Sequence, residues 1–167
     1  MAEYLKGIVT ERDSSKGMVR VKFQDHDDMV SYWLPVVQRK TLKNKYIDMP
    51  DINEHVACLM EDNYEEGVVI GAIYSNADAV PIDSNEKDHV TYKDGTTMEY
   101  DRATHTHRIN YKDGTSIEYD AGSGKFEISF KDGGEIKYES SSGFMTIEAK
   151  TVLTLKAPIV NINPHLP

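Results

Sequence analysis

The sequence predicts an all-β protein with two domains, an OB-fold barrel over residues 1–80 and a strand repeat over residues 81–167. Three observations predict it. Apolar residues alternate with polar ones at a period of two, no stretch shows the period of an amphipathic helix, and a strand–turn–strand unit recurs every 19 residues. A polar stretch from Ser75 to Lys87 marks the boundary between the domains.

The first domain is expected to contain five short strands. They are expected at residues 6–10, 18–23, 32–37, 54–60 and 66–74. The stretch 18–23 alternates clearly, because Val, Val and Phe occupy one parity and Met, Arg and Lys the other. Pro35 has no amide hydrogen to donate and limits its strand to an edge or a bulge. Five strands without a helix favour a small closed barrel such as the OB fold.

The second domain contains an internal repeat. The stretch Val90–Thr96 recurs as Ile109–Thr115 and as Ile128–Gly134, and a weaker copy begins at Met145. Each copy reads as a strand, an Asp-Gly or Gly-Gly turn, and a second strand. In every strand one parity is aliphatic or aromatic and the other is polar or charged. We therefore expect a sheet with one dry face and one wet face.

The dry face of this repeat predicts self-association. About seven strands would expose an apolar surface larger than the few hundred Å² usual for a soluble monomer. The first domain is too small to cover that surface. We expect the dry face to meet copies of itself in a closed cyclic oligomer, which also protects the strand edges. The residues alone argue for an oligomer without fixing the number of chains.

Two histidines on the dry face are the candidate metal ligands. His105 and His107 are two residues apart, and on a strand they would project from one face. In the repeat His107 aligns with Phe126 and Met145, while His105 aligns with Gly124 and Gly143. Three chains would bring six imidazoles to the axis, which suits octahedral iron, nickel or cobalt better than zinc. The alternative is a pair of buried histidines bonded to each other, to backbone or to trapped water.

Other candidate sites carry weaker signals. His165 is open to a second axial site, and the acidic stretch Asp25–Asp28 lacks the calcium-loop pattern and favours a solvated turn. Cys58 lies in an apolar stretch and is expected to be an inert core thiol. The sequence has no nucleophile elbow, phosphate loop or HExxH motif, so we expect no enzymatic activity and no catalytic residue.

Charge and composition narrow the function further. Asp and Glu number 28 against 19 Lys and Arg, a formal net charge of −9, which argues against nucleic acid and anionic membranes as partners. The first residues lack the apolar stretch of a secretory signal, and a single cysteine fits a reducing compartment. We expect assembly in the cytoplasm.

The order of these segments resembles the phage baseplate assembly protein V family, the central spike of contractile tails. The resemblance rests on the barrel stretches 18–23, 32–37 and 67–76 and on the alternating stretch 153–163, and it covers essentially the whole chain. It implies a homotrimer in which the OB folds form a collar and the C-terminal halves intertwine as a triple-stranded β-helix.

The resemblance also implies partners, a place and a metal. The partners are the baseplate hub and tail tube proteins, the target cell envelope and, as a further candidate, a small tip protein. The protein would cap the tube of a virion or phage-tail-like particle and pierce the envelope when the sheath contracts. Spikes of this family hold iron through an HxH motif, which implies one Fe²⁺ or Fe³⁺ per trimer at His105 and His107. Because 60 residues follow His107, that ion would sit partway along the shaft.

Three alternatives remain open at the level of sequence. The barrel could bind an oligosaccharide or oligonucleotide, as OB folds often do. The histidine pair could activate water in a metal-dependent hydrolase. The same fold could also serve a bacteriocin-like particle or a type VI secretion system rather than a phage.

Overall fold

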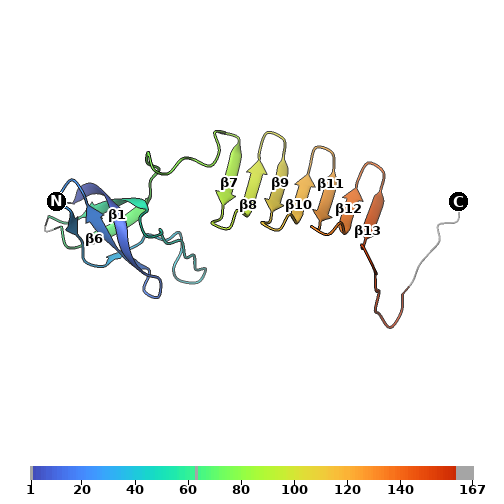
Figure 1. Ribbon diagram of the computed structural model, residues 1–167, viewed down its shortest axis with the longest axis horizontal. Coiled ribbons are helices and arrows are strands. Elements are labelled where there is room, and N and C mark those ends of the chain that lie inside the picture. The colour runs from blue at the N-terminus through green and yellow to red at the C-terminus, as the bar shows by residue number, and fades with distance from the viewer. Residues whose placement is uncertain (1, 63, 161–167) are drawn as a thin grey trace. The chain divides into compact units, whose positions relative to one another are not determined.

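Figure 1 shows the computed structural model, which describes residues 2–62 and 64–160. These residues form strands, turns and extended segments, and the all-β prediction is confirmed. The described residues include no helix, and hence none that could cross a membrane. The chain divides into two compact units, Met1–Val80 and Pro81–Pro167, and each is described by itself.

The first unit is a barrel of six strands. They are β1 (Glu3–Asp13), β2 (Met18–Phe23), β3 (Met29–Val30), β4 (Leu34–Pro35), β5 (His55–Met60) and β6 (Gly67–Ala72). The sheet has the order β3-β2-β1-β5-β6, and β4 pairs with β2. The residues after β4 close the barrel onto β6, because Val36 forms a parallel bridge with Val69 and the Val37 amide donates to the Val69 carbonyl at 2.9 Å.

Alternating side chains fill this barrel. Val19, Val21 and Phe23 of β2 are fully buried, as the sequence pattern predicts. They pack in one core with residues of the other strands. The remaining members of that core are Leu5, Val9, Leu34, Val36, Val56, Cys58, Met60 and Val69. The small barrel thus buries its apolar parity and leaves its polar parity to solvent.

Two details of the barrel differ from the prediction. The strand expected over residues 32–37 is only two residues long, because Pro35 cannot donate to a ladder and both aromatics before it are exposed. The short strand β3 was not expected. It follows a tight turn in which Asp27 and Asp28 take positive φ angles of 52° and 57°, a conformation that Asp tolerates better than most residues.

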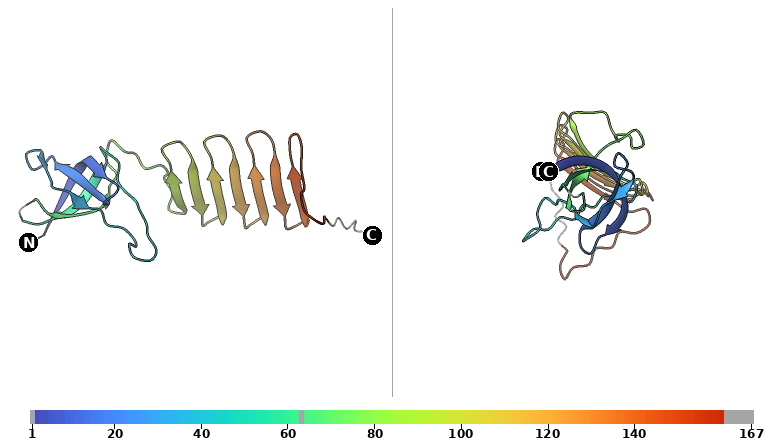
Figure 2. Two further views of the ribbon diagram at one scale, coloured as in Figure 1. Left: turned by 90° about the horizontal axis from the view of Figure 1, so that it is seen from below. Right: turned by 90° about the vertical axis from the view of Figure 1, so that its left-hand side faces the viewer.

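The second unit is a meander of seven five-residue strands. They are β7 (Lys87–Thr91), β8 (Thr97–Asp101), β9 (Thr106–Asn110), β10 (Ser116–Asp120), β11 (Lys125–Ser129), β12 (Glu135–Glu139) and β13 (Phe144–Glu148). Each strand pairs with its neighbours in the chain, in the order β13 to β7 (Figure 2). The 19-residue repeat is therefore two strands and two turns.

Two kinds of turn alternate along the meander. At one edge Gly95, Gly114 and Gly133 take φ angles near +90°, and the preceding aspartates accept hydrogen bonds from turn amides. At the other edge, the turns end on residues with φ between +57° and +71°. Gly124 and Gly143 fill this position in two copies. Glycine suits both edges because it has no Cβ to oppose a positive φ.

The segment after β13 departs from the prediction. The alternating stretch 153–163 and the resemblance it carries imply strands there, yet residues 149–160 contain no strand. Within the second unit β13 is the last strand of the sheet, and a further strand would have to find a hydrogen-bonding partner there. Residues 161–163 and the candidate ligand His165 lie outside the described residues.

Candidate functional site

The meander carries an apolar face made of two straight rows of side chains. The aliphatic row consists of Val90, Met98, Ile109, Ile117, Ile128, Ile136 and Ile147, paired directly across the strands. The aromatic row consists of Tyr100, His107, Tyr119, Phe126, Tyr138 and Met145. Tyr100 is 42% exposed and Tyr119 49%, so the rings of this row lie open in the single chain.

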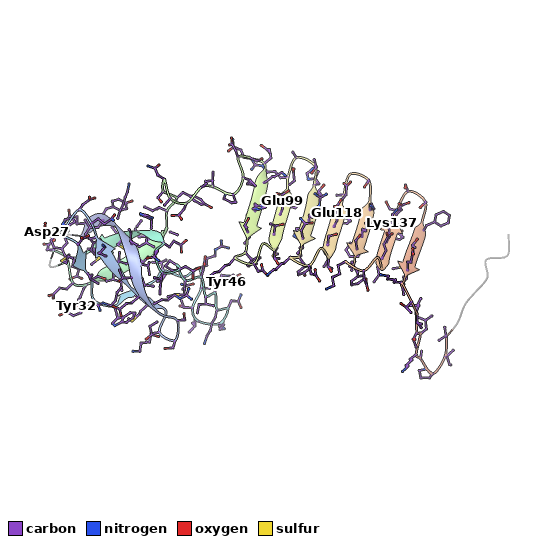
Figure 3. The ribbon with its side chains drawn as sticks, viewed as in Figure 1. Asp27, Tyr32, Tyr46, Glu99, Glu118 and Lys137 are labelled. Carbon is purple, nitrogen blue, oxygen red and sulfur yellow. The ribbon has the colours of Figure 1, made fainter. Side chains whose placement is uncertain are left out.

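The opposite face carries charges that pair within the chain. Glu99 accepts from Lys87 at 2.8 Å and lies 3.0 Å from Nδ1 of His89, and Arg108 pairs with Glu118 at 2.6 Å. The hydrogen bond from Lys87 lowers the pKa of Glu99. Figure 3 shows Glu99, Glu118 and Lys137 following one another along the meander. Charges on the polar face thus pair within the chain. On the apolar face the rings of the aromatic row are exposed, whereas most of the aliphatic row is half-buried.

The two candidate ligands lie on different kinds of backbone. His107 is on β9, directly between Tyr100 and Tyr119 in the aromatic row. His105 is not on a strand, and the prediction that both imidazoles project from one strand is wrong for it. It ends the turn before β9 with a φ of 57°. The geometry of the repeat explains this, because glycine takes the left-handed position in the other copies.

Tyr100 nevertheless links the two histidines. Its hydroxyl lies 3.5 Å from Nδ1 of His105, while its backbone is paired with that of His107. Both imidazoles are exposed; that of His105 lies near the phenol, and His107 is the cross-strand neighbour of Tyr100. In the described part of the chain, no three His, Cys, Asp or Glu side chains are grouped so as to hold a metal ion. One chain therefore offers two imidazoles, one near the Tyr100 hydroxyl and one on the strand paired with Tyr100.

The remaining described candidates belong to the barrel. Cys58 is buried in the core, and desolvation raises the pKa of its thiol to about 12, which fits the expected inert role. The acidic stretch Asp25–Asp28 is an exposed turn, as expected, with Asp28 paired to Lys22 at 3.2 Å.

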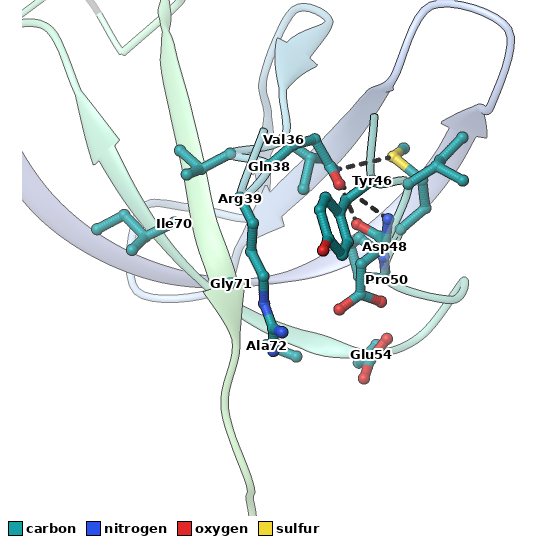
Figure 4. Close-up of a pocket in the computed structure, with 13 residues that line it drawn as sticks. Val36, Gln38, Arg39, Tyr46, Asp48, Pro50, Glu54, Ile70, Gly71 and Ala72 are labelled. Atoms are coloured by element: carbon teal, nitrogen blue, oxygen red, sulfur yellow. Dashed lines mark hydrogen bonds between the residues drawn. The ribbon is translucent and has the colours of Figure 1, made fainter. Parts of the chain in front are cut away.

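Sequence reasoning missed one feature of the barrel, the loop between β4 and β5. Figure 4 shows a hollow between this loop and β6, lined by Arg39, Tyr46, Ile70 and others. The side-chain amide of Gln38 closes the base of the loop. It accepts from the Asp48 amide at 2.8 Å and donates to the Asp48 carbonyl at 2.9 Å. The available signal was the run of four cations within residues 39–45 of an acidic chain.

Comparison with known proteins identifies the first unit. Residues 5–74 match a family described as the type VI secretion system/phage-baseplate injector OB domain. The match runs from within β1 to the end of the barrel. No curated protein matches the chain. The match supports a structural role in an injection machine.

Proposed function

We propose that this chain, whose OB domain belongs to the type VI secretion and phage-baseplate injector family, is a central spike. The spike would be a trimer and would form part of a contractile injection machine. In this proposal, three OB domains form a collar against the baseplate hub and tail tube, and the meanders form the shaft. The shaft pierces the target cell envelope when the sheath contracts. The particle assembles in the bacterial cytoplasm, and a small tip protein can complete its point.

The exposed apolar face of the meander is the observation that supports this proposal. The aliphatic and aromatic rows run across the strands in register, so three copies can turn these rows toward one axis and remove them from water. The opposite face, with its internal ion pairs, would then face solvent. An intertwined triple-stranded β-helix satisfies both faces and continues the pairing beyond β13.

A metal ion on the axis is the second part of the proposal. His105 and His107 supply two imidazoles per chain and six per trimer, a set that suits octahedral Fe²⁺ or Fe³⁺. His105 also occupies a left-handed position that glycine takes in two other copies. A residue kept in an unfavourable backbone conformation indicates a functional role, and metal ligation accounts for it. The bound ion would tie three chains together and stabilise only the assembled state.

The fold suits a mechanical task. In the meander the strands lie side by side, so their hydrogen bonds run along the direction in which the sheet grows. Compression along that direction presses backbones that are already at the roughly 4.8 Å spacing of paired strands. Three such sheets facing one another would resist bending as well, because no apolar row could separate from the axis without becoming hydrated.

Native mass spectrometry of the full chain tests the proposal. We expect a trimer with one metal mass per three chains. A monomer would refute the spike, and a trimer without metal would refute only the histidine site. In a second test, Tyr111→Asp places a carboxylate on the apolar face and should prevent assembly. The matched control is Asn110→Asp. It places a carboxylate at the neighbouring residue, on the polar face of the sheet, and should leave the trimer intact.

A further inference from the structure

The loop between β4 and β5 is positively charged, whereas the barrel that carries it is acidic. We call residues 39–47 the basic loop; they include Arg39, Lys40, Lys43 and Lys45 and no acidic residue. All nine residues are exposed. The ion pairs formed by Lys and Arg of the first unit, among its described residues, use cations outside this loop.

The basic loop also presents apolar side chains from a fixed base. Leu42 is 83% exposed and Ile47 is 71% exposed. The Tyr46 amide donates to the Lys40 carbonyl at 3.0 Å, which holds the two ends of the loop tip together. Below it, the two hydrogen bonds between Gln38 and the Asp48 backbone close the base. A held loop that shows both cations and aliphatic side chains to solvent suits protein contact.

A hollow of opposite character lies elsewhere on the same barrel. We call it the acidic hollow; it is lined by Tyr32, Trp33, Pro35, Glu61, Glu65, Glu66, Gly67 and Val68. Its aromatic side chains are substantially exposed, with Tyr32 at 62% and Trp33 at 41%. Carboxylates form ion pairs with cations, and aromatic rings bind cations and pack against aliphatic side chains.

The two surfaces lie at opposite ends of β6. The hollow borders Gly67 and Val68 at the start of the strand, whereas the loop borders Ile70 to Ala72 at its end. Figure 3 shows Tyr32 and Tyr46 on opposite sides of the barrel. A loop on one side therefore does not fill the hollow of its own chain. Two complementary patches at different places on one molecule make head-to-tail contacts, which close into a ring when the rotation allows it.

We propose that the basic loop of one copy docks into the acidic hollow of the next, and that these contacts close the ring of OB domains. The inference rests on the proposed trimer and specifies how its collar is held. Lys43 and Lys45 would pair with Glu61 and Glu66, which orients the copies and makes the contact sensitive to salt. Leu42 and Ile47 would lie against the aromatic side chains and supply apolar burial.

Carbodiimide cross-linking of full-length chains tests the contact, because this reagent joins Lys amines to carboxylates in ion pairs. Two variants are co-expressed, K40Q/K43Q/K45Q and E61Q/E65Q/E66Q. In mixed trimers the loop of the second variant can reach only the intact hollow of the first, so a link from Lys43 or Lys45 to Glu61 or Glu66 must join two chains. We expect this link in mixed trimers and in neither variant alone.

Charge reversal supplies the control. K43E/K45E removes the amines that react, so its loss of links serves only as the baseline. Adding E61K/E66K should restore links between loop and hollow with the roles of amine and carboxylate exchanged. The matched variant K6E/K16E changes two exposed cations outside the loop and should leave the links unchanged. A trimer in which the loop forms no link to the hollow, or links only to other carboxylates, overturns this inference and leaves the spike intact. A monomer refutes the proposed function itself.

Discussion

The hydroxyl of Tyr100 lies 3.5 Å from Nδ1 of His105, and the backbone of the same tyrosine is paired with that of His107. Tyr100 thus approaches the imidazole of a turn residue with its hydroxyl, and its backbone pairs with the strand residue that carries the other imidazole. The relationship places His107 within the aromatic row, next to Tyr100, and His105 on the turn beside that tyrosine. It also brings the turn residue His105 next to the strand-borne ligand candidate despite its different backbone conformation.

Replacing His105 with glycine should separate metal binding from folding. Gly124 and Gly143 hold the same turn position at φ angles of 65° and 71°, so His105→Gly keeps the turn. We expect the variant trimer to lose its metal. With chelator present, the free energy of unfolding of the variant should exceed that of the parent by about 1 kcal/mol, because glycine removes the backbone strain at this position.

Metal analysis and thermal unfolding with and without chelator measure these two effects. His107→Phe is the matched comparison, because Phe126 fills that position in the next copy. One metal per trimer in both variants would contradict the histidine site.

Close packing at Gly7 should make the barrel intolerant of a methyl group there. A Cβ at Gly7 would lie 2.4 Å from Cγ1 of Val21 and 2.6 Å from the carbonyl oxygen of Lys22. We expect Gly7→Ala to lower the free energy of unfolding by about 1–3 kcal/mol. Gly71→Ala is the control, because its Cβ would meet nothing within 4 Å. Urea unfolding compares the pair, and equal stabilities would contradict the packing argument.

Aspartates in the turns of the meander should make it sensitive to acid. Amide hydrogen bonds from Thr104 and Thr115 lower the pKa of Asp101 and Asp113, and the hydroxyl of Ser123 lowers that of Asp120. A carboxyl whose pKa is depressed in the folded state contributes stability above its ordinary pKa of 3.8. That contribution is lost as the pH falls through the lower, folded value.

Melting temperatures from pH 6 to pH 2, followed by circular dichroism, measure this loss. We expect a decline that begins near the ordinary aspartate pKa, about 4. The isosteric variant D101N/D113N/D120N should decline less steeply. An unchanged slope would show that other carboxyls dominate the acid response.

The thiol of Cys58 should be protected until the barrel opens. Desolvation raises its pKa from 9.0 to about 12, so the folded state keeps the thiol proton in a range where the unfolded state releases it. Stability from this group is complete below pH 9 and declines as the pH rises toward 12. At pH 8 we expect a thiol reagent to label the native chain much more slowly than the chain in urea. Equal labelling rates would contradict burial.

Much of the fold could be predicted because its signals are local. Alternation at Met18–Phe23 fixes which side chains fill the barrel, and the 19-residue spacing fixes the register of the meander, as the row from Ile109 to Ile128 shows. Turn chemistry was also accessible, since glycine supplies the positive φ at Gly95 and Gly114. These features depend on a few neighbouring residues and on one repeated length.

Other features depend on contacts that a linear pattern does not contain. A histidine two residues before another reads as part of the same strand, yet the hydrogen-bonded turn ends at His105. The strands expected after β13 have the right alternation, yet in the described residues of one chain none of them forms and the outer edge of β13 pairs with no further strand. The approach of the basic loop to β6 follows from barrel closure at Val36, which joins segments more than 30 residues apart.

The meander has a simple relation between chain length and reach. Each 19-residue copy adds two strands, and strands in a sheet are about 4.8 Å apart, so a copy extends the sheet by about 10 Å. Every strand closes only a short loop onto its predecessor, and adding or deleting one copy creates no new kind of contact. A gene could therefore adjust how far this protein extends in steps of about 10 Å by duplicating or losing one copy, without redesigning either end.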